Sequence, residues 1–234
     1  MASARQIALF LHLLLQPQPG DDESVGVQGP VPGEVRRIGL ALEPNQGMDE
    51  WVRREQIDLL FIHRSYRLLF LTMPEPVGVI TYQRAFDRWL FSTQNPFLVQ
   101  SFGLHEITPI TWREEEIVGF VAAVIPESWP EFLERANAAF MGTESALLPT
   151  RKVVCRAAFL EAMSAVLVES AAALGADVYV TGQTRQPGLP AIEQTGLGLI
   201  TVGRRHLEWW GLTCLGQLLI EQFPELAVVR FGSR

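Results

Sequence analysis

The sequence has few cysteines and no excess of positive charge, and each shortage excludes a class of protein. Only two cysteines, Cys155 and Cys214, occur among the 234 residues, too few for the disulfide framework of a small secreted domain. Both lie in apolar runs, which predicts buried free thiols in a reducing cytoplasm. The net charge of −7 and the pI near 5.2 do not provide the basic field that general nucleic-acid binding needs, so no nucleic-acid partner is expected.

Long apolar runs and well-known catalytic motifs are also missing. The apolar run at residues 7–15 follows Arg5, but it lacks a small-residue cleavage site and is too short to span a bilayer. We expect an amphipathic first helix there, no membrane partner and a cytoplasmic protein. The sequence contains no CxxC, HExxH, P-loop or nucleophile-elbow motif, so spacing alone assigns no chemistry.

What the sequence does contain is an alternation of helical and buried-strand patterns. With 48% hydrophobic and 19% charged residues, the chain can bury a substantial core. The alternation predicts an α/β protein of two lobes, residues 1–107 and 108–234, with mixed, largely parallel sheets and a crevice between them. We expect strands at residues 35–42, 57–62, 77–82, 107–112, 117–125, 152–155, 178–180, 197–202 and 226–231. We expect helices at residues 3–15, 48–56 (capped by Asp49), 95–102, 126–139 (capped by Ser128) and 157–174. A further helix should begin in the polar cluster at residues 204–208.

Polar side chains gather where three of these segments end. His63 and Arg64 follow one strand, Asp87 follows another, and Glu208 closes the cluster at residues 204–208. Carboxyl ends of parallel strands meet at one edge of a sheet, and His, Asp and Glu together suit Zn, Mn or Fe. Simpler interpretations remain open from spacing alone: a hydrogen-bonded structural histidine, a helix-capping aspartate, and a glutamate paired with a neighbouring arginine.

At these residues the sequence resembles the Nif-three-like family, whose bacterial members include the type 2 GTP cyclohydrolase I homologues. The resemblance covers nearly the whole chain through five short motifs in the same order. They fall at residues 23–28 (ESVGVQ), 57–65 (IDLLFIHRS), 83–87 (QRAFD), 175–183 (GADVYVTGQ) and 203–208 (GRRHLE). The resemblance implies a two-lobe fold, a dinuclear metal site between the lobes, and a homo-oligomer built as a dimer-based ring, such as a hexamer.

This sequence retains only part of the metal-binding set that the resemblance implies. His63, Asp87 and Glu208 match family ligands. Arginine cannot lose its proton to become a ligand, so an arginine at a ligand position replaces a metal charge with a permanent cation. Four family positions carry other residues here: Arg64 and Arg204 in place of histidines, Gln83 where another histidine lies, and Gln183 in place of a carboxylate.

Three hypotheses follow for this degraded site. In the first, Arg64 and Arg204 pair with Asp87 and Glu208, no cofactor binds, and the protein is a metal-free oligomeric binding or assembly protein of unknown ligand. In the second, a residual mononuclear site holds one divalent Zn, Mn or Fe ion, with His206 as a possible extra ligand, and the protein is a metal-dependent hydrolase acting on a nucleotide or pterin-like substrate. In the third, the arginines clamp a phosphate-bearing small molecule.

Overall fold

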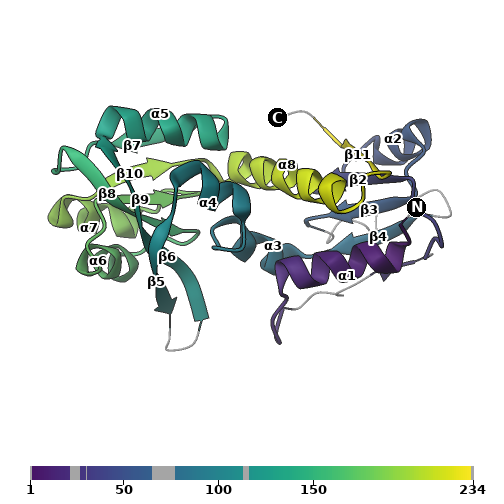
Figure 1. Ribbon diagram of the computed structural model, residues 1–234, viewed down its shortest axis with the longest axis horizontal. Helices are drawn as coiled ribbons and strands as arrows, with labels where there is room; N and C mark the ends of the chain where they lie inside the picture. The colour runs from purple at the N-terminus through teal and green to yellow at the C-terminus, as the bar shows by residue number, and fades with distance from the viewer. Residues whose placement is uncertain (1, 22–26, 30, 65–76, 113–115, 233–234) are drawn as a thin grey trace. The chain divides into compact units, whose positions relative to one another are not determined.

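The computed structural model describes residues 2–21, 27–29, 31–64, 77–112 and 116–232 (Figure 1). The chain divides into two compact units, Met1–Phe86 with Gly211–Arg234, and Asp87–Trp210. The division falls inside two helices, α3 (Gln83–Leu90) and α8 (Arg204–Gln222). These units differ from the predicted lobes, and the boundary at 107/108 stays a prediction for independently folding domains. Of the aligned motifs, residues 23–26 and Ser65 lie outside the described residues.

The first unit is built on a five-stranded sheet in the order β1-β4-β3-β2-β11. Neighbouring strands from β4 to β11 pair in parallel, and β1 pairs with β4 antiparallel. All four residues of β3 are buried, as expected for a central parallel strand covered on both faces. The strands are β1 (Val27–Gln28), β2 (Arg37–Ala41), β3 (Leu59–Ile62), β4 (Gly78–Thr81) and β11 (Ala227–Arg230).

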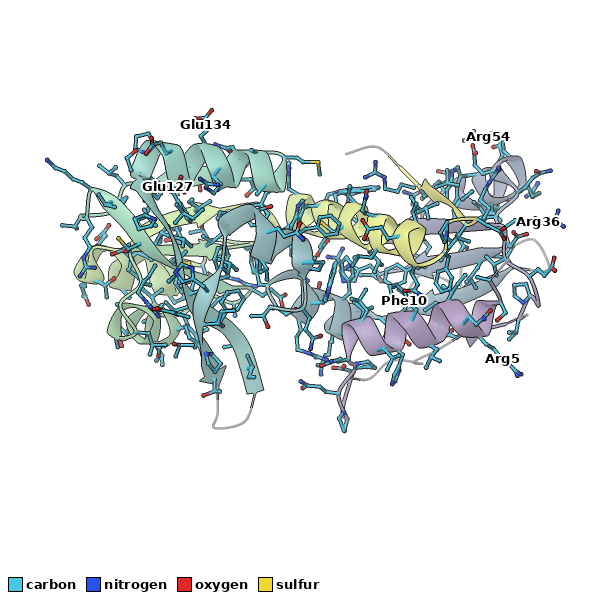
Figure 2. The ribbon with its side chains drawn as sticks, viewed as in Figure 1. Arg5, Phe10, Arg36, Arg54, Glu127 and Glu134 are labelled. Atoms are coloured by element: carbon cyan, nitrogen blue, oxygen red, sulfur yellow. The ribbon has the colours of Figure 1, made fainter. Side chains whose placement is uncertain are left out.

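Helices cover the two faces of this sheet. α2 (Met48–Glu55) packs Trp51 and Val52 against Leu60 and Ile62 of β3. On the other face, Gly216 of α8 lies so close to β2 that an added Cβ would be 3.2 Å from a methyl carbon of Leu40. α1 (Ala4–Leu15) begins at a Ser3–Gln6 capping box. Its Phe10 points toward α8 and meets Phe223 edge-on, with ring centroids 5.8 Å apart (Figure 2).

The second unit contains a six-stranded sheet in the order β5-β6-β8-β9-β10-β7. β8, β9 and β10 are parallel, and the remaining pairs are antiparallel. The strands are β5 (His105–Trp112), β6 (Glu116–Ser128), β7 (Ser145–Leu147), β8 (Val153–Leu160), β9 (Val178–Thr181) and β10 (Gly198–Thr201). The helical segments are α4 (Pro96–Phe102), α5 (Trp129–Phe140), α6 (Ala165–Ala173), the 3-10 turn Gln186–Gly188 and α7 (Leu189–Thr195).

Alternating side chains of β8 fill the two cores of this unit. Ala158 and Leu160 pack with α6 and α7, whereas Phe159 stacks against Phe102 and Phe120 on the opposite face. Figure 1 shows α5 on one side of the sheet and α6 and α7 on the other. No helix in the described part of the chain is long and apolar enough to cross a membrane.

The two units share a hydrogen-bonding arrangement that the sequence did not predict. In the first unit, one carboxylate oxygen of Asp58 accepts the backbone N–H groups of Arg36 and Arg37, at 2.8 and 3.0 Å. In the second, Asp177 accepts the N–H groups of Cys155 and Arg156 at the same two distances. Each aspartate thus ties the start of one parallel strand to its neighbour.

Most predicted elements are present, and four predictions were wrong, including the start of the helix predicted from residue 126. Residues 157–174 are not one helix, because β8 continues to Leu160 and α6 begins only at Ala165. Gly47 precedes α2 at the N-cap position, so Asp49 lies in the first turn instead. Cys155 is exposed, whereas Cys214 is buried as predicted. Ser128 does form the predicted capping box, with Glu131, although α5 begins after residue 128.

Candidate metal centre

His63 is held at the end of β3 by its backbone. Its N–H donates to the carbonyl of Ala41 at 3.0 Å, and the next N–H, of Arg64, donates to Leu42 at 2.8 Å. The imidazole is fully buried, and its ring centroid lies 4.9 Å from that of Phe86. The continuous apolar pattern of β3 therefore places one polar side chain directly beyond a buried strand.

Two buried carboxylates occupy equivalent positions on two helices. Asp87 is the fifth residue of α3, which follows β4, and Glu208 is the fifth residue of α8, which follows β10. Only 9% of Asp87 and 2% of Glu208 is exposed. Residues Thr81 and Thr201, which end the preceding strands, are also buried. Each carboxylate thus lies one helical turn beyond the carboxyl end of a parallel strand.

The structure brings these three side chains together. One ligand atom each of His63, Asp87 and Glu208 lies within 4.8 Å of the other two. Oxygen and nitrogen ligands lie about 2.0–2.2 Å from Zn²⁺ in a tetrahedral arrangement, so two ligands of one ion are separated by about 3.4 Å. Small side-chain adjustments would therefore let all three reach a single ion. An imidazole with two carboxylates is a donor set that Zn, Mn and Fe accept.

Arg204 contacts one of these carboxylates. Its Nε lies 3.2 Å from Oε1 of Glu208, one helical turn along α8. The arginine side chain is 50% exposed and the glutamate side chain only 3%. Burial lowers the pKa of the Arg204 guanidinium, but the hydrogen bond to Glu208 and the charges of Glu208, Asp87 and Glu161 outweigh it, so the pKa is raised. Arg204 is thus a cation beside the carboxylates, as the first hypothesis, that of a metal-free protein, expects.

The other predicted site residues have different surroundings. Arg64 is partly buried, and Gln83 is the first residue of α3. The predicted pairing of Arg64 with Asp87 stays a prediction. His206 lies on the helical stretch of α8, and its Nε2 is 2.9 Å from the carbonyl oxygen of Phe140. Because residues two apart on a helix face different directions, this imidazole is not in the group of three.

A small cavity of about 40 Å³ in the second unit adjoins this chemistry. The cavity is lined by the loops that follow the parallel strands β8 and β9, by α3 and by the start of α8. Its charged and polar lining residues are Asp87, Glu161, Gln183, Arg185, Arg204 and Glu208. Three acidic residues and two arginines thus line a space that holds only a few water molecules.

Comparison with known proteins agrees with this architecture. The family Duf34/NIF3 (NGG1p interacting factor 3) matches residues 3–233. The chain belongs to the Duf34/NIF3 family. A "GTP cyclohydrolase 1 type 2 homolog" of Pseudomonas aeruginosa is 19% identical over 204 residues, which cover 81% of each chain.

Solved structures show the same fold as this Duf34/NIF3 chain. TTHA1606 from Thermus thermophilus superimposes with a TM-score of 0.77 at 18% identity, covering 100% of this chain and 99% of the other. Reduced HcgD from Methanocaldococcus jannaschii gives a TM-score of 0.73 at 19% identity, covering 99% and 98%. At such identities the likeness concerns the fold, and the two mixed α/β sheets predicted from the sequence are confirmed.

Sequence reasoning on this Duf34/NIF3 chain missed two residues that line the cavity. Glu161 lay inside the helix wrongly predicted for residues 157–174, and Arg185 lies in the loop after β9. One signal could have located Glu161. Residues 157–160 are Ala-Ala-Phe-Leu, a short apolar run compatible with a buried strand, and a polar residue directly after such a run marks a strand end.

Proposed function

We propose that this chain binds one divalent transition metal ion through His63, Asp87 and Glu208, with Arg204 providing the positive charge that a second ion would contribute. The observation that carries this proposal is the convergence of three buried ligand atoms within 4.8 Å. It favours the mononuclear hypothesis over the metal-free one. Zn, Mn and Fe remain the candidate ions, because the donor set suits all three.

Electrostatics supports a cation at this position. Oxygens of Asp87 and Glu208 lie no more than 4.8 Å apart, a separation at which two negative charges repel by about 3 kcal/mol at an effective dielectric constant near 20. Arg204 reduces this repulsion, but its side chain is half exposed and contacts only one of the two carboxylates. A divalent ion that both carboxylates bind would remove the remaining repulsion.

The arrangement suits a metal-dependent hydrolase. Such an ion, when bound, supplies a polarised oxygen or an activated water. The residues of the chain do the rest: the three ligands hold the ion in a buried position, and Arg204 keeps a fixed positive charge beside it. The name of the P. aeruginosa relative, a GTP cyclohydrolase 1 type 2 homolog, supports a nucleotide or pterin-like substrate.

A metal-free binding or assembly protein is the second candidate. The contact of 3.2 Å between Arg204 and Glu208 favours it, because an arginine already engages one of the carboxylates. Membership of the Duf34/NIF3 family supports a homo-oligomer in either case. We carry the dimer-based ring or hexamer, the cytoplasmic location and the crevice between lobes as proposals. Light scattering after size-exclusion chromatography tests the oligomer: a monomer would contradict it.

Calorimetric titration of Mn²⁺ or Zn²⁺ into chelator-treated protein tests the metal proposal. We expect one ion per chain, with His63→Ala reducing the affinity at least tenfold because a ligand is lost. His105→Ala is the matched control, since His105 is an exposed histidine on β5 whose Nδ1 lies 3.0 Å from the Gly103 carbonyl. Absence of saturable binding would leave the metal-free candidate, and two ions per chain would contradict both.

A further inference from the structure

Two arginines line the cavity beside the metal ligands, and an arginine cannot itself bind a cation. Arg185 and Arg204 both line the cavity of about 40 Å³. We propose that these arginines bind a small oxyanion, a phosphate group, and that the anion binds only after the metal. This inference rests on the proposed metal function, and it names the class of ligand that the same site takes.

The contacts of Arg204 leave donors for such an anion. In the described chain Arg204 bonds Glu208 through Nε alone, so its two Nη groups carry N–H donors that this contact does not use. A guanidinium presents its donors in a planar fork that matches two oxygens of a phosphate or carboxylate. An arginine side chain stays protonated at any physiological pH, so these donors remain charged.

Arg185 presents a second guanidinium from a fixed piece of backbone. Its N–H donates to the sulfur of Met163 at 3.3 Å, and its carbonyl accepts the N–H of Gly188 at 2.9 Å. The side chain is exposed, and among the described residues it forms no hydrogen bond or ion pair with the protein. An anchored backbone with an unengaged guanidinium at a cavity wall is the arrangement expected of an anion-binding arginine.

The charges around the cavity set the order of binding. Three carboxylates, Asp87, Glu161 and Glu208, oppose the two arginines, so the lining alone carries one negative charge and repels an anion. A divalent cation reverses the sign to one positive charge. Metal ligation of Glu208 also weakens the hold of that carboxylate on Arg204. Both effects make the cavity attractive to an anion only once the metal is bound.

The size of the cavity limits what can enter. A volume of about 40 Å³ accommodates a few water molecules, whereas pockets that enclose a drug-sized ligand measure roughly 300–1,000 Å³. A single tetrahedral oxyanion fits this volume, and the rest of any larger molecule must lie outside. Free phosphate and the terminal phosphate of an ester both meet this limit.

Calorimetric titration of inorganic phosphate into the Mn²⁺-loaded and chelator-treated protein tests the proposal. We expect saturable phosphate binding in the loaded protein and at least tenfold weaker binding without metal. Arg204→Gln should weaken phosphate binding at least tenfold and Arg185→Gln severalfold, and Arg185→Gln, which changes no residue of the metal site, should still bind one Mn²⁺ per chain. Arg54→Gln is the matched control, because Arg54 lies on the outer side of α2 (Figure 2) and is 68% exposed.

The outcomes separate this inference from the metal proposal. Absent Mn²⁺ binding in the unmodified protein would refute the metal site, and with it the metal-first order. Normal Mn²⁺ binding with a phosphate affinity unchanged in Arg204→Gln, or equal without metal, would refute the anion site alone. Titration of a phosphate monoester in parallel distinguishes free phosphate from an esterified phosphate, because the ligand that fits the site better binds more tightly. Arg204→Gln must weaken whichever of them binds.

Discussion

Replacing Glu208 by glutamine should separate the folding role of this carboxylate from its metal-binding role. Glutamine has nearly the same size and can still accept the hydrogen bond from Arg204, but it removes a buried negative charge. In the metal-free protein the change removes a repulsion of about 3 kcal/mol with Asp87, taken at their maximum separation of 4.8 Å and a dielectric constant near 20. It also loses the attraction to the half-exposed Arg204, which contributes about 1 kcal/mol or less. On these two interactions alone, the variant should be at least as stable as the unmodified protein without metal.

Bound metal reverses the order of stability of the variant and the unmodified protein. At a free metal concentration of about 100 times Kd, the unmodified protein gains about 2.7 kcal/mol, which for a chain of this length raises Tm by roughly 5–10 °C. A hundredfold loss of affinity in Glu208→Gln would reduce the gain at the same concentration to less than about 1 kcal/mol. Differential scanning calorimetry with and without Mn²⁺ measures both effects.

The control for this experiment is Glu193→Gln, the same chemical change at an exposed position on α7. It should retain the full metal-induced shift in Tm. The reasoning is refuted if Glu208→Gln shows the same metal-induced shift as the unmodified protein, or if it destabilises the metal-free protein by several kcal/mol.

Further predictions concern the framework around the site. Asp177→Asn should lower the free energy of unfolding by about 2 kcal/mol in urea titrations, because a buried carboxylate that accepts three hydrogen bonds is replaced; an unchanged midpoint would contradict its role as an anchor. Gly119→Ala should abolish soluble expression, because the new Cβ would overlap the carbonyl oxygen of Phe159; a stable variant would show that β6 and β8 can separate. An alkylating reagent at pH 8 should label Cys155 and not Cys214 in the folded protein, and both in denaturant. Burial raises the pKa of Cys214 from 9.0 to about 12, so the thiol keeps its proton to higher pH in the folded state than in the unfolded state. The free energy of unfolding should therefore fall as pH rises from about 9 to 12. Cys214→Ala should reduce this fall, and an equal fall in the variant and the unmodified protein would contradict the prediction.

The elements that the sequence predicted best are those whose local pattern and tertiary role agree. β3 is a continuous apolar run because parallel pairing buries both of its faces. α1 starts at Ser3 and buries Ile7, Leu11 and Leu15, a helical spacing visible in the letters alone. The position of His63 directly after β3 also followed from its apolar pattern, whereas the helix α3, on which Asp87 lies, was not predicted.

Other features could not be predicted because distant partners decide them. The sequence analysis placed residues 157–160 in a helix, yet they form the C-terminal half of β8, where pairing with β6 and β9 holds them extended. Gly119, opposite Leu160, provides the matching space on β6. The carboxylate anchors Asp58 and Asp177 were hidden for the same reason, since each bonds backbone more than 20 positions earlier in the chain.

The metal content of the protein tests the central claim most directly. Protein purified without chelators and analysed for transition metals by mass spectrometry should contain close to one divalent ion per chain, and His63→Ala, prepared identically, should contain far less. The claim is contradicted by two ions per chain, by a negligible metal content that added Mn²⁺, Zn²⁺ or Fe²⁺ does not restore, or by equal metal in the variant.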